Sequence, residues 1–267
     1  MHLVADVGNT ETVLGMFEAG STELVHHWRF STTVPRTADE FGLLIQGLVA
    51  GAGHDPSAIQ RGVLGSVVPS ATGPLLRAMA ALSGDNVYQV DGGSDLPIEL
   101  DVDEPLTVGA DRIANTLAAS RLYGRDTIAV DLGTATTFDC ITKSGVFLGG
   151  VIAPGILVGL DWLSRRTAKL PRVELRPPVT VIGRRTESCI RSGVFYMAVD
   201  GADGVVDRIK GEWSPDALVV ATGGYATVVG PHSRTITEVE PFLTLIGLEM
   251  AGDCLEGSGE HPDEGKP

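Results

Sequence analysis

The sequence predicts an α/β protein made of two similar domains in tandem. Short apolar segments typical of strands alternate with amphipathic segments typical of helices along the chain of 267 residues. One strand–turn–strand motif also occurs twice, as VADVGNT at positions 4–10 and as AVDLGTA at positions 129–135. This spacing of 125 residues is too long for a solenoid repeat, so we expect two domains that each begin with the same hairpin.

The first domain is predicted to span residues 1–115. In order, we expect strands at 2–8, 12–18, 24–30 and within 62–70, and helices at 37–51, at 72–83 and from about 111 to a stop at Gly124. The first of these helices has a capping box, because Thr37 is followed three residues later by Glu40.

The second domain is predicted to span residues 116–252. We expect a hairpin within 126–142, a Gly-rich strand region at 145–155, a helix near 156–165, a long helix at 186–210, a strand within 217–224 and a last helix near 242–254. Residues 253–267 are rich in Gly, Glu and Pro, so they are predicted to be a disordered tail.

Composition narrows the class of protein. The net charge of −14 argues against nucleic acid as a partner, because phosphate backbones bind basic surfaces. No apolar run approaches the roughly 18 residues of a membrane span, and polar residues interrupt the N-terminal apolar run, so we expect a cytoplasmic protein without a membrane partner. Three cysteines without a C-x-x-C pair favour neither a disulfide framework nor a structural zinc.

In both copies of the repeated motif, the first strand carries an aspartate near its end, Asp6 or Asp131, and a glycine follows two residues later. The glycine permits a tight turn whose N–H groups can donate hydrogen bonds to phosphate oxygens, and the aspartate can hold Mg²⁺, usually through water. One copy alone could be a plain β-hairpin. Two copies, with a late Gly-Gly turn in ATGG at 221–224, resemble the nucleotide site of actin, hexokinase and Hsp70. No P-loop or dinucleotide fingerprint is present.

The segment Gly109-Ala110-Asp111-Arg112 lies where the first predicted domain meets the second. Asp111 is a candidate general base for a substrate hydroxyl, and Arg112 is a candidate partner for an anionic substrate group. The alternative is that both residues only begin a helix, since Asp is favoured in the first turn. Position alone does not decide between the two.

Several blocks of sequence are more specific. DVGNT, TADEFG, VGADRI, VDLGTATTFD, GGVIAPG, RTAKLPRVEL, VIGRRT and LTLIGL follow one another in this order. Together they resemble type III pantothenate kinases, bacterial enzymes of the actin-like superfamily that act in coenzyme A synthesis. The resemblance covers residues 2–250. It implies two actin-like (ribonuclease H-like) domains with a central cleft, and a cytoplasmic homodimer that uses ATP to phosphorylate pantothenate to 4′-phosphopantothenate.

The resemblance also implies roles for single residues. Asp111 is the implied proton acceptor, Asp131 the implied ligand of a monovalent cation (K⁺ or NH₄⁺), and Asp6 the residue near Mg²⁺. The implied ATP contacts are Asp6, Val7, Gly8, Asn9, Thr10, Glu11, Thr12, Val13 and Thr134. The implied pantothenate contacts are Gly109, Ala110, Asp111, Arg112 and, from the neighbouring subunit, Thr186.

The chain departs from the family pattern at four positions. Glu11 and Arg185 stand where the family usually has Asn, Val102 where it often has Tyr, and Ile246 where it usually has Glu. A carboxylate at position 11 is unfavourable near ATP phosphates unless it points away, as strand alternation allows. Two alternatives therefore stay open: a non-catalytic nucleotide-binding regulator on the same fold, and a kinase for another small hydroxylated acid. The aspartates at 6, 111 and 131 are all present, so we expect activity.

Overall fold

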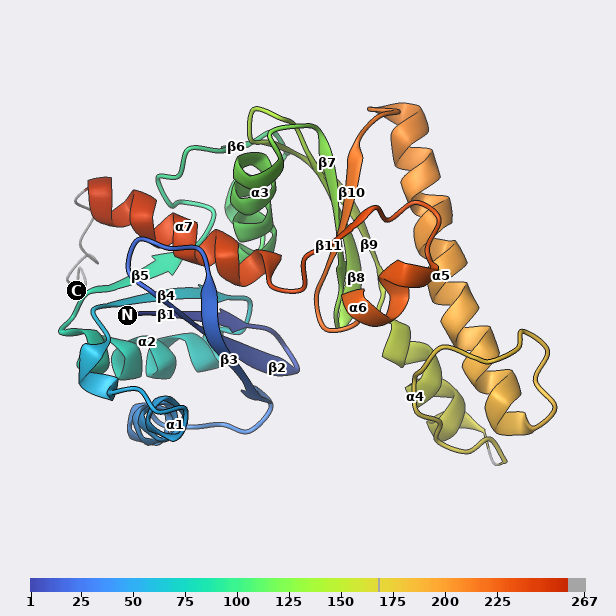
Figure 1. Ribbon diagram of the computed structural model, residues 1–267, viewed down its shortest axis with the longest axis horizontal. Helices are drawn as coiled ribbons and strands as arrows, with labels where there is room; N and C mark the ends of the chain where they lie inside the picture. The colour runs from blue at the N-terminus through green and yellow to red at the C-terminus, as the bar shows by residue number, and fades with distance from the viewer. Residues whose placement is uncertain (168, 259–267) are drawn as a thin grey trace. The chain divides into compact units, whose positions relative to one another are not determined.

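The computed structural model describes residues 1–167 and 169–258, which form two compact units (Figure 1). Unit 1 comprises residues 1–121 and 243–258, and unit 2 comprises the described residues of 122–242. Each unit is built on a mixed sheet with helices packed against it, so the predicted α/β fold class is confirmed.

Unit 1 contains a five-stranded sheet in the order β3-β2-β1-β4-β5. β1 pairs with β2 as an antiparallel hairpin and with β4 in parallel. The five strands of this sheet are β1 (His2–Val7), β2 (Glu11–Phe17), β3 (Leu24–Ser31), β4 (Arg61–Ser66) and β5 (Val87–Val90), and the short strand β6 (Glu99–Leu100) lies outside it. The helices are α1 (Ala38–Gly51), α2 (Pro69–Ser83), α3 (Ala110–Tyr123) and α7 (Leu243–Ser258).

The two faces of this sheet are covered by different helices. Alternate residues of β1, Leu3, Ala5 and Val7, point into a core that α1 and α2 complete. α7 covers the opposite face, since a Cβ on Gly15 of β2 would lie 3.0 Å from Leu245 and one on Gly65 of β4 would lie 2.8 Å from Leu248. The glycines on the strands therefore let α7 approach closely.

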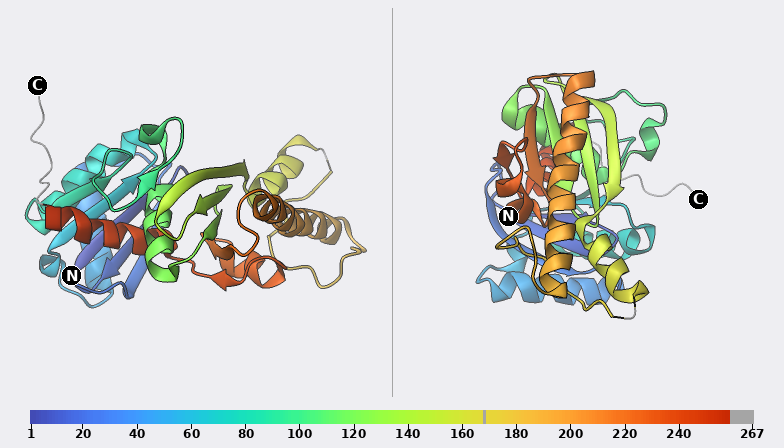
Figure 2. Two further views of the ribbon diagram at one scale, coloured as in Figure 1. Left: turned by 90° about the horizontal axis from the view of Figure 1, so that it is seen from above. Right: turned by 90° about the vertical axis from the view of Figure 1, so that its right-hand side faces the viewer.

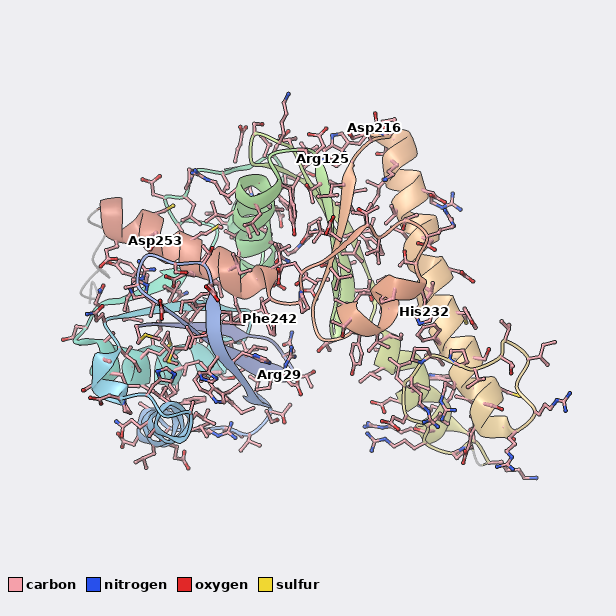
Figure 3. The ribbon with its side chains drawn as sticks, in the orientation of Figure 1. Arg29, Arg125, Asp216, His232, Phe242 and Asp253 are labelled. Carbon is pink, nitrogen blue, oxygen red and sulfur yellow. The ribbon has the colours of Figure 1, made fainter. Side chains whose placement is uncertain are left out.

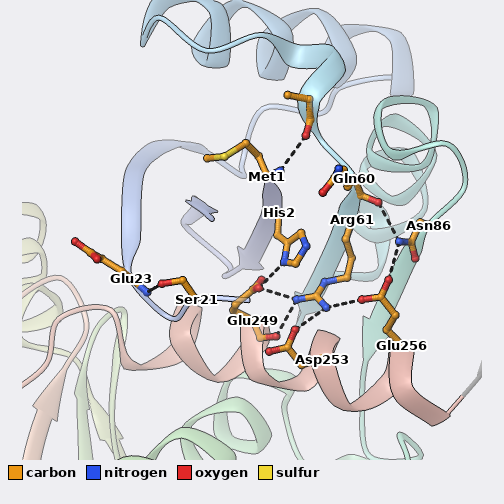
Figure 4. A network of polar contacts seen from close by, with 11 residues as sticks. Met1, His2, Ser21, Glu23, Gln60, Arg61, Asn86, Glu249, Asp253 and Glu256 are labelled. Atoms are coloured by element: carbon orange, nitrogen blue, oxygen red, sulfur yellow. Dashed lines mark hydrogen bonds and ion pairs between the residues drawn. The ribbon is translucent and has the colours of Figure 1, made fainter. Parts of the chain in front are cut away.

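A buried ion-pair network fastens α7 to the sheet (Figure 4). Arg61 on β4 places Nη2 2.6 Å from Glu249, and its Nη1 lies 2.7 Å from Asp253 and 2.9 Å from Glu256. His2 Nδ1 on β1 is also 2.6 Å from Glu249. Because Arg61 is buried, these contacts neutralise a charge that would otherwise be costly to bury.

The network accounts for two differences from the sequence prediction. We expected the first domain to end at residue 115 and the last helix to belong to a second domain of residues 116–252. Instead, the last helix packs within unit 1. The predicted tail of residues 253–267 also begins later, because residues 253–258 are the last turns of α7 and two of them contact Arg61. Residues 259–267 lie outside the described part of the chain. The composition of residues 253–267 does not show that Arg61, far away in the sequence, contacts two of them. The prediction from composition therefore began the disordered tail several residues before the helix ends.

Unit 2 contains a sheet in which β11, β10, β7, β8 and β9 lie side by side in that order. The strands are β7 (Thr127–Leu132), β8 (Ala135–Ile141), β9 (Val146–Pro154), β10 (Leu218–Thr222) and β11 (Glu238–Val239). The helices are α4 (Ile156–Arg166), α5 (Thr186–Glu212) and the short α6 (Ala226–Val229). α5 runs along one face of the sheet (Figure 2), where Phe195 and Val199 pack against Ile128 and Val130 of β7.

A hydrogen bond outside the core joins the segments that precede β7 and β10. Arg125, just before β7, donates from Nη2 to the carbonyl oxygen of Asp216, just before β10, over 2.7 Å (Figure 3). β7 and β10 run in parallel, so their carboxyl ends also meet, at Asp131 and Thr222. Ligands in open α/β sheets bind at this end of the strands, and the motif residues of unit 2 lie there.

Candidate active site

The first turn of the repeated motif is closed by its own backbone. Gly8 donates its N–H to the carbonyl oxygen of Glu11 over 3.1 Å, and Thr32 N–H donates to Thr10 O over 3.0 Å. Thr12 is buried, with its hydroxyl 2.8 Å from that of Thr32. The ATP contacts expected between Asp6 and Val13 therefore form one continuous segment, in which Val7 and Thr12 are core residues and Asn9, Thr10 and Glu11 are exposed.

Glu11, the departure from the family pattern in this turn, has a cationic neighbour. Its Oε2 lies 3.4 Å from Nη1 of Arg29 on β3, and both side chains are partly exposed. Val13 pairs with Arg29 and also with Asp6, so Arg29 and Asp6 project from the same face of the sheet, two strands apart. The positive charge of Arg29 offsets the extra carboxylate beside the turn.

The segment Gly109–Arg112 forms the start of α3. Asp111 accepts a hydrogen bond at Oδ1 from the N–H of Arg112 over 2.9 Å. A Cβ on Gly109 would lie 2.4 Å from that same oxygen, so only glycine leaves Asp111 this rotamer. The glycine and the aspartate of this segment are thus structurally linked.

The start of α3 lies at the carboxyl end of β4. A Cβ on Gly65 would lie 3.2 Å from Cβ of Ala110, and a Cβ on Gly109 would lie 3.4 Å from Val67. Because Gly65 pairs directly with Asp6, the structure brings Asp6 and the Gly109–Arg112 segment to the same edge of the unit 1 sheet. No local pattern in the sequence reveals this proximity, since more than 100 residues separate the two segments.

The second copy of the motif forms the corresponding hairpin in unit 2. Gly133 N–H donates to Ala135 O over 3.0 Å, so this turn is one residue shorter than the first. Asp131 is half-buried near the end of β7, and Thr134 is exposed at the tip of the turn. The predicted ATP and cation residues of this copy therefore belong to one hairpin.

Two glycines that we did not predict to be site residues pack against this second turn. A Cβ on Gly155, which precedes α4, would lie 2.2 Å from Thr134 O. A Cβ on Gly223, whose φ is +86°, would lie 2.2 Å from Asp131 Oδ1. Both positions must be glycine for backbone to approach the turn this closely. The Gly-Gly motif was the visible signal for Gly223, and Gly155 is the last residue of the block GGVIAPG, to which we assigned no role.

Thr186 lies at the first position of α5 and is exposed. The preceding Arg185 is held by its backbone, because its N–H donates to Ser188 Oγ and its carbonyl accepts from that hydroxyl. A groove of about 720 Å³ is open beside the helix. It is lined by Val181, Ile182, Gly183, Cys189, Ser192, Gly193, Tyr196, Met197, Asp200 and Gly201.

One further cluster in the described residues has the composition of a metal site. Ligand atoms of His2, Glu249 and Asp253 lie within 4.8 Å of one another. The guanidinium of Arg61 contacts both carboxylates, so a protein cation already supplies the positive charge. We therefore interpret this cluster as structural.

Across residues 1–167 and 169–258, no helix has the length and apolar character needed to cross a bilayer.

One protein family matches most of this chain. The family model for type III pantothenate kinase matches residues 2–208. A type III pantothenate kinase of Moorella thermoacetica is 44% identical over 250 residues, which cover 94% of this chain and 98% of that relative.

Two solved structures share the fold. A Baf family transcriptional activator from Campylobacter jejuni is 19% identical, with a TM-score of 0.57 and coverage of 96% of this chain and 98% of that one. A 2-dehydro-3-deoxygalactonokinase from Sinorhizobium meliloti is 12% identical, with a TM-score of 0.58 and complete coverage of both chains. At these identities the likeness concerns the fold alone. The family match and the identity along nearly the whole chain show that this protein belongs to the type III pantothenate kinase family.

Proposed function

We propose that the protein transfers the γ-phosphoryl group of ATP to the primary hydroxyl of pantothenate, giving 4′-phosphopantothenate, the first step of coenzyme A synthesis. Family membership over 94% of the chain supports this proposal most strongly. Asp6, Asp111, Asp131 and Thr134 are all present and lie at the carboxyl edges of the two sheets or at the start of α3.

Asp111 is the proposed proton acceptor. Phosphoryl transfer depends mainly on positioning and charge neutralisation, and a carboxylate commonly takes the proton of the attacking hydroxyl. The hydrogen bond from Arg112 N–H holds one oxygen of Asp111 and leaves the other available. Arg112, on the next residue, would pair with the carboxylate of pantothenate as a planar guanidinium. Thr186 would contact the same substrate.

Each of the turns after β1 and β7 is proposed to bind phosphate oxygens through its backbone N–H groups and through the hydroxyl of Thr10 or Thr134. Asp6 is half-buried beside the first turn and offers hard oxygen ligands, which suit Mg²⁺. Asp131 lies between two glycine turns where no Cβ fills the space, which suits a larger monovalent cation, K⁺ or NH₄⁺. Bound cations at these positions would supply neutralising charge for the phosphates.

A homodimer is proposed from the surface of α5. Ile182 and Met197 beside the groove are 83% and 79% exposed, which is unusual for apolar side chains gathered at one place. The helix also carries Gly193, Gly201 and Gly204, beside which a Cβ would meet nothing within 4 Å. A second copy can therefore approach this helix closely, and Thr186 at its start would lie near the contact.

The test is a coupled ADP-release assay with pantothenate and Mg-ATP, run in K⁺ or NH₄⁺ and again in Na⁺ alone. We expect turnover that requires both pantothenate and the larger cation. Folded protein that binds ATP but shows no turnover would favour the regulator alternative. Turnover with another hydroxylated acid but not with pantothenate would favour the second alternative. Static light scattering measures the dimer separately.

A further inference from the structure

Three oxygen-bearing side chains form a row across the sheet of unit 2. Thr222 on β10 pairs directly with Asp131 on β7, and Asp131 pairs directly with Thr137 on β8. Directly paired residues project from the same face of a sheet, so all three side chains lie on one face. This is the face opposite to the apolar core of Ile128 and Val130, because successive residues alternate along β7.

Thr222 differs in its hydrogen bonding from Thr127, which is equally buried in the same sheet. It is fully buried, and within the described residues its Oγ1 has no hydrogen-bond partner. Thr127, equally buried at the other end of β7, donates its hydroxyl to Arg125 O over 2.9 Å. Buried hydroxyls normally have a partner, and an ion is one of the groups that can satisfy them. The Thr222 hydroxyl therefore requires an explanation that the protein atoms do not provide.

The Asp131 carboxylate is directed toward the same place. Its Oδ1 lies 2.2 Å from where a Cβ on Gly223 would be, and 3.4 Å from where a Cβ on Gly133 would be. The carboxylate thus lies between the turn that follows β7 and the turn that follows β10. The positive φ of Gly223 brings the backbone directly after Thr222 against this oxygen.

We propose that Thr222 Oγ1 is a further ligand of the monovalent cation that the proposed function assigns to Asp131, an inference that rests on that assignment. A hydroxyl oxygen keeps lone pairs for a cation while its hydrogen points elsewhere. Asp131 and Thr222 would then share one cation at the adjoining ends of β7 and β10. Cation binding would stabilise the Gly223 turn as well as the phosphate turn after β7.

The test measures cation binding without catalysis. The melting temperature of the protein is followed in KCl and in choline chloride at equal ionic strength, with no ATP or pantothenate. A ligand of the native state raises the melting temperature of a chain of this length by roughly 2–3 °C for each tenfold increase in concentration above its Kd. We expect this K⁺-specific rise in the unchanged protein and in Thr222→Ser, which keeps the hydroxyl. We expect most of it to be lost in Thr222→Val and all of it in Asp131→Asn.

Thr127→Val is the matched control. It removes a buried threonine hydroxyl from the same sheet, so it should lower the melting temperature and leave the K⁺-specific rise intact. A Thr222→Val protein that keeps the full rise while Asp131→Asn loses it overturns the proposal. The proposal is also overturned if Thr137→Val loses the K⁺-specific rise and Thr222→Val keeps it, because the cation would then lie toward β8. If the unchanged protein shows no K⁺-specific rise but still phosphorylates pantothenate, the cation assignment fails and the proposed reaction stands.

Discussion

The guanidinium of Arg61 and the carboxylate of Glu249 lie 2.6 Å apart with almost no solvent contact, although 188 residues separate them in the chain. Arg61 is on the strand next to β1, and β1 carries Asp6 near its end. The pair therefore fixes the C-terminal helix against the strands that position the first phosphate turn. Its contribution is structural, since neither residue belongs to the proposed site.

Replacing Arg61 by methionine should destabilise the protein strongly. The substitution removes the guanidinium from the fully buried carboxylate of Glu249 and leaves His2 beside it, and breaking a buried pair in this way costs about 3–5 kcal/mol. The free energy of unfolding measured with urea should fall by this amount. Arg165→Met is the control, because Arg165 is 79% exposed and lies 3.9 Å from Asp161, and it should change stability by less than about 0.5 kcal/mol. Equal effects of the two substitutions would contradict the prediction.

Asp111→Asn should abolish most turnover. An amide cannot accept the hydroxyl proton, and loss of general-base catalysis lowers kcat by about 10²–10⁴-fold. The rate of ADP release reports this, while ATP-induced thermal stabilisation should persist. Asp39→Asn is the matched control, because Asp39 is also an acidic residue in the first turn of a helix but is exposed on α1. Near-normal turnover in Asp111→Asn would exclude Asp111 as the proton acceptor.

The Glu11–Arg29 pair should affect the affinity for ATP more than stability. Arg29→Ala leaves the Glu11 carboxylate uncompensated beside the phosphate turn, so the KM for ATP should rise several-fold at low salt. The double variant Glu11→Asn with Arg29→Ala should recover most of that loss. A KM that stays raised in the double variant would mean that Arg29 acts on ATP by itself.

Mixing two inactive variants tests whether Thr186 acts across a dimer. Asp111→Asn and Thr186→Val proteins, each with low activity, are co-expressed so that mixed dimers form. If Thr186 serves the neighbouring subunit, a mixed dimer contains one site with neither substitution, and turnover should reappear. Turnover no greater than that of the two separate proteins would place Thr186 in its own subunit's site or in none.

Lowering the pH should reduce the stability of unit 2, because Asp203 on α5 becomes protonated. Burial acts to raise the pKa of Asp203, but hydrogen bonds from Ser233, Thr235 and the Arg234 N–H outweigh it and lower the pKa below its usual value. A carboxyl whose pKa is lower in the folded state stabilises above its unfolded pKa, near 4, and loses that contribution as pH falls further. Between pH 5 and pH 3, the urea midpoint of Asp203→Asn should therefore change less than that of the unchanged protein. Asp200→Asn, exposed on the same helix, should behave like the unchanged protein.

Local sequence patterns were sufficient for much of the fold. The capping box of α1 is confirmed, because Thr37 Oγ1 accepts from Glu40 N–H and Glu40 accepts from Thr37 N–H. The two Asp-x-Gly turns are hairpins, as their repeated sequence indicated. Such features depend on residues within a few positions of one another, which a single sequence displays.

Long-range relationships were not visible in the same way. The periodicity of the last helix identified its apolar face but not the sheet that this face covers. Arg61 had no distinguishing neighbours in the sequence, because its partners lie in α7. The approaches of Gly155 and Gly223 to the second turn likewise depend on tertiary packing, as does the unpartnered hydroxyl of Thr222.

The return of the chain to unit 1 also bears on how the protein is made. A ribosome completes β1 to α3 and then all of unit 2 before α7 emerges, and domains generally fold as they are synthesised. During that interval the sheet of unit 1 has helices on one face only, and Arg61 lacks the carboxylate of Glu249 on α7. Co-translational folding of this protein can therefore complete its second unit before its first.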